Sequence, residues 1–110
     1  MKILIQNDNI PNETFINEFM VISEKNGIPK DYISTEGYSE DRICLEEDNG
    51  KLLVYYAYRN SKKDLKEYDN IDIALLDVAE RCTESEEQYR NIASEYTEKV
   101  NQCRYVGILY

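Results

Sequence analysis

The sequence predicts an α+β fold in which a small antiparallel β-meander of about four strands packs against about three helices, in the order α-β-β-β-β-α-α. Three patterns predict it. Apolar residues recur at helical spacing near the start, an Asn-Gly pair separates two β-prone runs in the middle, and two further helical stretches follow. No repeat, low-complexity tract or linker divides the chain, so residues 1–110 are interpreted as a single domain.

The first helix is predicted to begin with Asn12 as its N-cap and to end at Gly27-Ile28-Pro29. Glycine readily adopts the left-handed conformation that follows many helices, and proline cannot continue the helix. The apolar positions between these signals are Phe15, Ile16, Phe19, Met20 and Ile22. Residues 2–6 precede this helix as either an edge strand or an apolar leader into it.

Residues 31–69 are predicted to form the β-meander, with Tyr32-Ile33-Ser34 at its start and Arg42–Glu47 as the next strand. The Asn49-Gly50 pair is the strongest short hairpin signal, because a type I′ turn needs positive φ at both central residues. A two-residue turn fixes the pairing of the flanking strands. The predicted pairs are Ile43–Tyr56, Leu45–Val54 and Glu47–Leu52 on one face, and Cys44–Tyr55, Arg42–Ala57 and Glu46–Leu53 on the other.

This register places two adjacent tyrosines on opposite faces of the sheet. Tyr56 shares its face with aliphatic residues and is predicted to lie in the core. Tyr55 shares its face with charged side chains and a cysteine, so it is predicted to be half-exposed. A second turn over residues 60–63 should return the chain through residues 64–68.

The last third of the chain is predicted to contain two helices and an apolar tail. Asp69 or Asn70 caps the first helix, and overlapping capping boxes at residues 83–86 and 85–88 start the second. The first apolar stripe is Ile71, Ala74, Leu75, Val78, Ala79 and Cys82, and the second is Tyr89, Ile92, Ala93, Tyr96 and Val100. The tail over residues 104–110 is apolar enough to pack down, with a strand as one option.

Few residues in the chain could carry catalysis. Histidine is absent, so neither a Ser-His nor a Cys-His pair can form, and no glycine-rich phosphate-binding motif is present. The acidic run Glu46-Glu47-Asp48 lacks the spacing of a calcium loop, and a strand would direct Glu46 and Glu47 to opposite faces. We therefore expect no metal site, no cofactor and no enzymatic activity.

The cysteines and the hydropathy pattern indicate a compartment. Cys44, Cys82 and Cys103 have no C-x-x-C spacing and are interpreted as reduced core residues. The sequence contains neither a signal-peptide pattern nor an apolar span of about 18 residues. A cytoplasmic protein that does not enter a membrane is therefore expected.

The chain is strongly acidic, with a net charge of −9 at pH 7. Such a charge repels nucleic acids and anionic membranes and attracts basic proteins, although solubility alone could also explain it. One acidic cluster spans residues 40–48 and a second spans residues 77–87. We interpret the second as a solvated face at a helix start, where acidic residues are favourable.

The first acidic cluster lies beside tyrosines in the predicted hairpin. Tyrosine offers a large rigid contact area and a hydroxyl group, which is why protein interfaces are enriched in it. An acidic rim with tyrosine anchors would suit a basic protein partner. The residues predicted to contact this partner are Glu40, Asp41, Glu46, Tyr55, Tyr58 and Arg59.

Several short motifs in the middle of the chain resemble a known family. They are Asp41–Glu46, Gly50-Lys51, Val54–Tyr56, Arg59-Asn60, Lys62, Asp64–Asp69 and Ala74–Leu76. Together, over about residues 25–82, they resemble the small immunity proteins of bacterial polymorphic-toxin and contact-dependent growth-inhibition systems. The family often has Glu-Arg-Gly where this chain has Tyr58-Arg59-Asn60, and tryptophan where it has Leu52.

The resemblance implies a cytoplasmic protein that binds one cognate toxin domain and blocks its active site or an exosite. Many toxins of such systems are nucleases, whose substrate-binding surfaces must be basic to hold phosphates. An acidic inhibitor could occupy that surface, and complementary charge would speed association. No nucleic acid or membrane partner is expected.

Two other functions fit the same sequence. The chain could be an adaptor or regulatory subunit for a folded partner other than a toxin. The upstream gene would discriminate, because immunity genes lie directly downstream of their toxin genes. The chain could instead be an enzyme that uses carboxylates, which predicts a deep pocket containing two acids with raised pKa values.

Overall fold

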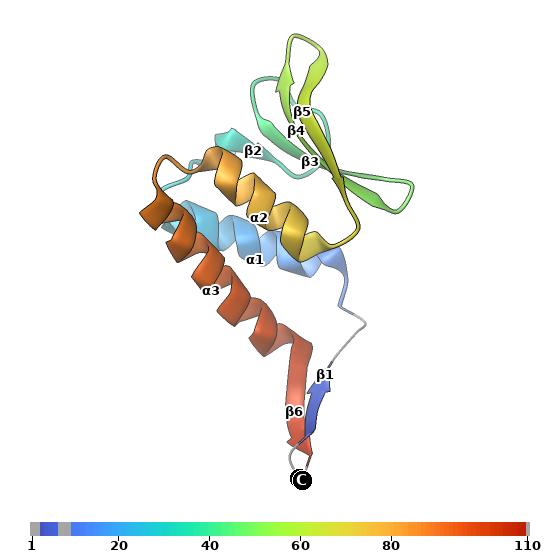
Figure 1. The fold of residues 1–110 in the computed structure, drawn as a ribbon, viewed down its shortest axis with the longest axis vertical. Helices are drawn as coiled ribbons and strands as arrows, with labels where there is room; N and C mark the ends of the chain where they lie inside the picture. The colour runs from blue at the N-terminus through green and yellow to red at the C-terminus, as the bar shows by residue number, and fades with distance from the viewer. Residues whose placement is uncertain (1–2, 7–9, 110) are drawn as a thin grey trace.

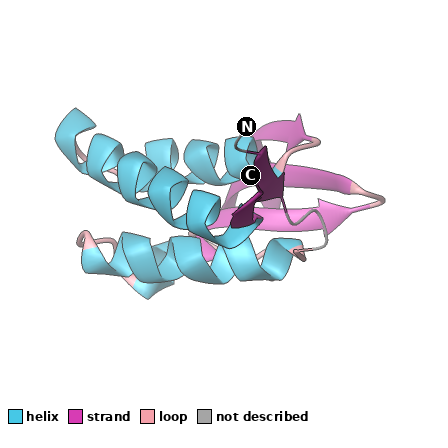
Figure 2. Cartoon of the chain, turned by 90° about the horizontal axis from the view of Figure 1, so that it is seen from below, coloured by secondary structure: helices cyan, strands magenta, loops and turns pink. Residues whose placement is uncertain are grey.

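The computed structural model describes residues 3–6 and 10–109, with side chains described for residues 10–104. Its elements are β1 (Ile3–Gln6), α1 (Asn12–Lys25), the 3-10 helix η1 (Lys30–Tyr32), β2 (Ile33–Ser34), β3 (Ile43–Asp48), β4 (Lys51–Tyr58), β5 (Ser61–Tyr68), α2 (Ile71–Cys82), α3 (Glu86–Arg104) and β6 (Tyr105–Leu109). The predicted α+β class and the order α-β-β-β-β-α-α are confirmed, and β1 and β6 are added at the two ends (Figure 1). The three α-helices run side by side in the end view of Figure 2.

Helix α1 ends at the predicted signal. Gly27 has a φ of 94°, and its N–H donates to the carbonyl oxygen of Glu24 at 3.1 Å. The N–H of Ile28 donates to the carbonyl oxygen of Ser23 at 3.0 Å. These two bonds form a Schellman motif, which satisfies carbonyl groups that the helix itself leaves free, and Ile28 is buried in the core.

The prediction of Asn12 as N-cap is wrong by one residue. Pro11 is the N-cap and Asn12 is the first residue of α1. The proline ring fixes φ near the observed −68°, and the proline carbonyl accepts the N–H of Thr14 at 3.1 Å. The helix therefore starts without a side-chain cap.

Strands β2 to β5 form one sheet in the order β2-β3-β4-β5. The β3–β4 and β4–β5 pairs are antiparallel, as predicted, whereas β2 pairs with β3 in parallel, so the sheet is mixed. A parallel pair needs a crossover in place of a hairpin turn. Residues 35–42 form this crossover and pass over the outer face, meaning the face of the sheet opposite the helices.

The β3–β4 hairpin has the predicted turn and the predicted register. Asn49 and Gly50 have φ values of 50° and 81°, as a type I′ turn requires. The predicted pairs from Ile43–Tyr56 to Glu47–Leu52 all occur on both faces. The predicted pairing continues past the strand, because the N–H of Ala57 donates to the carbonyl oxygen of Arg42 at 3.0 Å.

The turn between β4 and β5 lies at Arg59-Asn60, earlier than the predicted residues 60–63. Both residues have positive φ, 51° and 61°, and β5 begins at Ser61. Arginine rarely adopts positive φ, so the local sequence gives only a weak turn signal there. Strand β5 is also irregular near Asp64, whose φ is 52°.

The main core lies between the helices and the inner face of the sheet, meaning the face that packs on the helices. It contains the predicted apolar stripe of α2 and, from the stripe on α3, Ile92, Tyr96 and Val100. Asn70 caps α2, since its side-chain oxygen accepts the N–H of Asp72 at 2.8 Å. Ser85 caps α3, since its hydroxyl oxygen accepts the N–H of Gln88 at 3.1 Å. The observed cap of each helix, Asn70 for α2 and Ser85 for α3, is therefore one of the two caps predicted for it.

The predicted burial of Tyr55 and Tyr56 is wrong in both cases. Tyr55 is 0% exposed and forms a second apolar cluster on the outer face with Cys44, Leu53 and Ala57. The crossover covers this cluster, because the ring of Tyr38 stacks on that of Tyr55 with centroids 6.1 Å apart. Tyr56 is only half-buried and is not one of the buried residues of the main core. Strands β3 and β4 are thus covered on both faces, where the prediction has one covered face, whereas β5 is exposed except at Tyr68.

Strands β1 and β6 form a separate antiparallel two-stranded ribbon. The ribbon extends from the end of the molecule that lies away from the four-stranded sheet (Figure 1). Of the two options for residues 2–6, the strand is the one observed, over Ile3–Gln6, and the tail is a strand from Tyr105. Residues 2 and 110 lie outside the described part of the chain. None of the helices described is long and apolar enough to cross a membrane.

Candidate functional site

The six residues predicted to contact a partner surround the free end of the β4–β5 hairpin, but they occupy both faces of the sheet. Glu46 and Tyr55 form a cross-strand neighbourhood on the outer face. Tyr58 lies on the inner face, two residues after Tyr56. The remaining three, Glu40, Asp41 and Arg59, lie in the crossover and in the turn.

Glu40 holds the tip of the β4–β5 hairpin. Its carboxylate accepts the hydroxyl of Tyr38 at 2.6 Å, the N–H of Asn60 at 3.4 Å and the N–H of Arg59. These donors, the hydroxyl first, lower the pKa of Glu40. Desolvation and the Glu40 carboxylate raise the pKa of Tyr38 to about 12. Glu40 is therefore an exposed anion in a fixed position, and it binds both amides of a turn that has positive φ.

Glu46 is held from two sides on the outer face. It accepts the hydroxyl of Tyr55 at 2.7 Å and forms an ion pair of 3.1 Å with Lys62. The Tyr55 hydrogen bond is the largest cause of a lowered pKa at Glu46, and Lys62 adds to it. Burial raises the pKa of Tyr55, and the Glu46 carboxylate adds to that increase. Tyr55 thus positions Glu46 from below the surface and offers no contact area of its own.

Tyr58 is exposed on the inner side of the hairpin tip, with 38% of its surface accessible. Its ring stacks on Tyr56, with centroids 6.2 Å apart and an interplanar angle of 18°. The guanidinium group of Arg59 lies 5.1 Å from the centroid of the Tyr58 ring. Stacking and cation–π contact limit the rotamers of both side chains, so the tip presents a fixed aromatic edge.

Asp41 is the least constrained of the predicted carboxylates. Its backbone is fixed, because its N–H donates to the carbonyl oxygen of Ala57 at 2.7 Å and its φ is 62°. Its side chain is exposed and makes no hydrogen bond or ion pair within the part of the chain that is described. The carboxylate of Asp41 is therefore available to a partner.

Two side chains of this region were not among the predicted contacts. Tyr38 covers Tyr55 and binds Glu40, and Lys62 lies 5.1 Å from the centroid of the Tyr55 ring. The closeness of Tyr38 to Glu40 in sequence was a usable signal for the first. No signal was available for Lys62, because its face depends on where the second turn falls.

An open hollow of about 500 Å³ lies on the inner side, between β5 and the C-terminal half of α2. Ile43 and Tyr56 contribute its apolar lining, and Asp77, Glu80 and Arg81 of α2 contribute its charged lining. Asp77 is half-buried and binds internally, since it accepts the hydroxyl of Tyr68 at 2.7 Å and pairs with Arg81 at 3.1 Å. The interpretation of the whole second acidic cluster as a solvated face is therefore wrong for Asp77.

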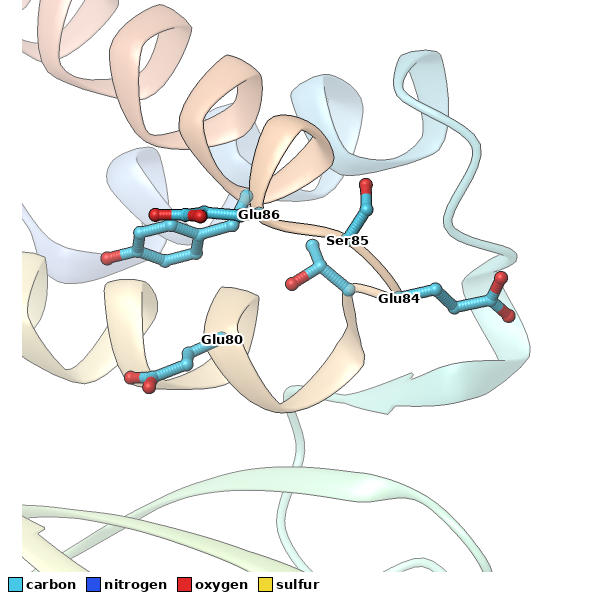
Figure 3. Close-up of a pocket in the computed structure, with 6 residues that line it drawn as sticks. Glu80, Glu84, Ser85 and Glu86 are labelled. Atoms are coloured by element: carbon cyan, nitrogen blue, oxygen red, sulfur yellow. The ribbon is translucent and has the colours of Figure 1, made fainter.

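The rest of the second cluster is exposed around the junction of α2 and α3. Glu80, Glu84 and Glu86 contribute to the lining of a hollow there. Figure 3 shows Glu80 and Glu86 projecting to the same side, from α2 and α3, whereas Glu84 projects to the opposite side. Glu80 also lines the hollow beside Tyr56, so the acidic surface continues from one hollow to the other.

The side chains described do not form a metal-binding group of three or more cysteines and carboxylates. The cysteines are free, and Cys44 and Cys82 are buried. Burial raises the pKa of Cys82 to about 12, so its thiol stays protonated at neutral pH. Comparisons with known proteins find no matching family model, no similar curated protein and no similar solved structure.

Proposed function

We propose that this protein is an immunity protein that binds and neutralises a cognate bacterial toxin domain, with a basic nuclease domain as the best-fitting partner. The protein occludes the active site or an exosite of the toxin. The sequence motifs that resemble immunity proteins support this function, and so does the exposed acidic and aromatic tip of the β4–β5 hairpin.

The observation that carries the proposal is the arrangement of that tip. Glu40 is fixed by three donors, Asp41 lies next to it with a free carboxylate, and Tyr58 presents an exposed ring that is stacked on Tyr56. A binding surface that is ordered before the partner arrives loses less conformational entropy on association. Such an arrangement suits the capture of a folded protein surface.

Charge supports the same partner class. The net charge is −9, and the lowered pKa values of Glu40 and Glu46 keep these carboxylates ionised to a more acidic pH than an ordinary glutamate. A nuclease must present a basic surface to bind phosphates. Complementary charge can raise association rate constants toward about 10⁸–10⁹ M⁻¹s⁻¹ at low salt, which favours rapid neutralisation.

Co-expression with the toxin domain encoded by the gene immediately upstream tests this function. We expect the chain to restore growth of the host and to copurify with the toxin domain as a complex. The double variant Asp41→Asn with Tyr58→Ala should protect less well, because it removes one free carboxylate and the exposed ring. Asparagine is chosen because it tolerates the positive φ of 62° at Asp41.

The matched control is Glu98→Gln, which removes one exposed carboxylate from α3 without changing the hairpin. It should protect as well as the wild type. An upstream gene that encodes no toxin domain, or a toxin domain that neither binds nor is neutralised, would contradict the proposal.

A further inference from the structure

Two adjoining hollows form a groove between α2 and the inner side of strands β3 to β5. The hollow of about 500 Å³ beside α2 adjoins a smaller one of about 230 Å³, and the two share Ile43, Tyr56 and Arg81 in their linings. Tyr32 and Asp41 line the far end of the smaller hollow. The groove therefore extends from Glu80 on α2 to Asp41 in the crossover.

The middle of this groove is aromatic and aliphatic. Ile43 and Tyr56 are only partly buried, and Ile43 packs against the main core. Tyr58 extends the aromatic surface through its stack on Tyr56, and Tyr32, which is 49% exposed, lines the same end of the groove as Asp41. Such a surface suits a long side chain with an apolar stem, which can lie flat on the rings.

The ends of the groove are acidic. Its lining contains Asp41, Asp64, Asp77 and Glu80 against the cations Lys66 and Arg81. Arg81 is already bound, because it pairs with Asp77 at 3.1 Å and donates to the carbonyl oxygen of Asp64 at 2.7 Å. In contrast, the carboxylates of Asp41 and Glu80 have no hydrogen-bond or ion-pair partner among the residues described.

Two further features favour a cation in the groove. Glu86 at the start of α3 projects to the same side as Glu80 and extends the acidic surface there (Figure 3). The C-terminus of a helix also carries partial negative charge from its free carbonyl groups, and α2 ends at Cys82 beside the groove. The charge and the lining of the groove thus both favour a long side chain that has an apolar stem and a cationic end.

We propose that this groove is the docking site for an arginine or lysine side chain on a loop of the protein partner. The aliphatic stem of that side chain lies on Ile43 and Tyr56, and its cationic group reaches the carboxylate of Glu80 or Asp41. An arginine also stacks on Tyr56, since guanidinium groups bind aromatic faces favourably. The inference rests on the proposed function only for the identity of the partner, which is then the toxin domain.

The groove is tested without the toxin by NMR titration of the full-length ¹⁵N-labelled chain. The probe is a blocked pentapeptide of alternating glycine and arginine, and its matched control has glutamate in place of arginine. The arginine peptide should cause saturable shifts at the amides of Ile43, Tyr56 and Glu80, and the glutamate peptide should cause none. Shifts elsewhere, shifts equal for both peptides, or no saturable shifts would overturn the inference.

Two charge reversals make the test specific. Glu80→Lys should lower the affinity for the arginine peptide by about tenfold, because the substitution converts an electrostatic attraction into a repulsion. Glu98→Lys, on another surface of the molecule, should leave the affinity unchanged. Both variants change exposed helix positions, and a dispersed spectrum verifies that each is folded.

The toxin complex separates the failure of this inference from that of the proposed function. If the chain neutralises the toxin but Glu80→Lys binds it as tightly as the wild type, the groove is not the docking site and the inhibitor function stands. If the arginine peptide binds the groove but no toxin domain is bound, the groove inference stands and the proposed function fails.

Discussion

The hydroxyl of Tyr55 donates a 2.7 Å hydrogen bond to the carboxylate of Glu46, and Tyr55 itself is completely buried. One of the six predicted contact residues is therefore a support for another. The outer face presents Glu46 at the surface, while the tyrosine edge of the hairpin is presented on the inner side by Tyr56 and Tyr58.

Removing the Tyr55 hydroxyl tests whether Tyr55 only positions Glu46 or also contacts the partner. Tyr55→Phe should lower the free energy of unfolding by about 1–2 kcal/mol, because a partly buried hydrogen bond to a charged group is lost while the ring remains. Urea denaturation measures this change. Binding of the toxin domain by the folded variant should change little. A large loss of affinity with unchanged stability would show that Tyr55 contacts the partner directly.

The lowered pKa of Glu46 predicts a pH dependence of stability. The ordinary pKa is 4.5 and the folded value is lower, so folding favours the ionised form. This contribution is complete above the unfolded pKa and is lost as the pH falls through the folded pKa. Glu46→Gln should be less stable than the wild type at pH 7, and the difference should shrink below about pH 4.

Urea denaturation of both proteins between neutral and acidic pH measures that difference. Glu47→Gln is the control, since Glu47 is exposed on the adjacent position of β3. Its stability relative to the wild type should not follow the same curve. A gap between Glu46→Gln and wild type that stays constant as the pH falls would contradict the assigned role of Glu46.

Glu40 should protect the turn amides that it binds. Glu40→Ala removes the acceptor for the N–H groups of Arg59 and Asn60, so these amides should exchange with solvent faster. Hydrogen exchange followed by NMR measures this directly. The turn at Asn49-Gly50 belongs to the other hairpin and serves as the internal control. Equal acceleration in both turns would indicate general destabilisation rather than loss of a local contact.

Gly50 tests the backbone of the first hairpin without any change in packing. Its φ is 81°, and an added Cβ would meet no atom within 4 Å. Gly50→Ala should therefore lower the free energy of unfolding by about 1–2 kcal/mol through backbone strain alone. Gly50→Asn should lose less, because asparagine tolerates positive φ better. Equal losses in thermal or urea denaturation would show that strain is not the cause.

The sequence predicts most of this fold because its strongest signals are local. Gly27 and Ile28 end α1, and Asn49-Gly50 sets a hairpin register that is correct at every pair. The burial of Tyr55 could not be predicted in this way, because it depends on the crossover over residues 35–42. That crossover follows from a parallel pair of strands with no turn signal of its own.

The sequence predicts several residues of the candidate site, but it does not predict how they are placed relative to α2. The hairpin register places Tyr56 and Tyr58 on one face, but it could not show that the space beside Tyr56 would stay open. The sequence alone groups Glu80 with the exposed acidic residues at a helix start, because its position across from Tyr56 depends on the packing of α2 against the sheet. The α2 contribution to the groove is thus a tertiary feature.

The central claim is that the chain acts by presenting an acidic, tyrosine-bearing surface to another protein, and the salt dependence of association tests it most directly. Stopped-flow kinetics with the cognate toxin domain should give an association rate constant that falls about tenfold or more between low and high ionic strength. Asp41→Asn and Glu80→Lys should flatten that dependence, and Glu98→Gln should not. An association rate that is independent of salt, or no association at all, would contradict the account.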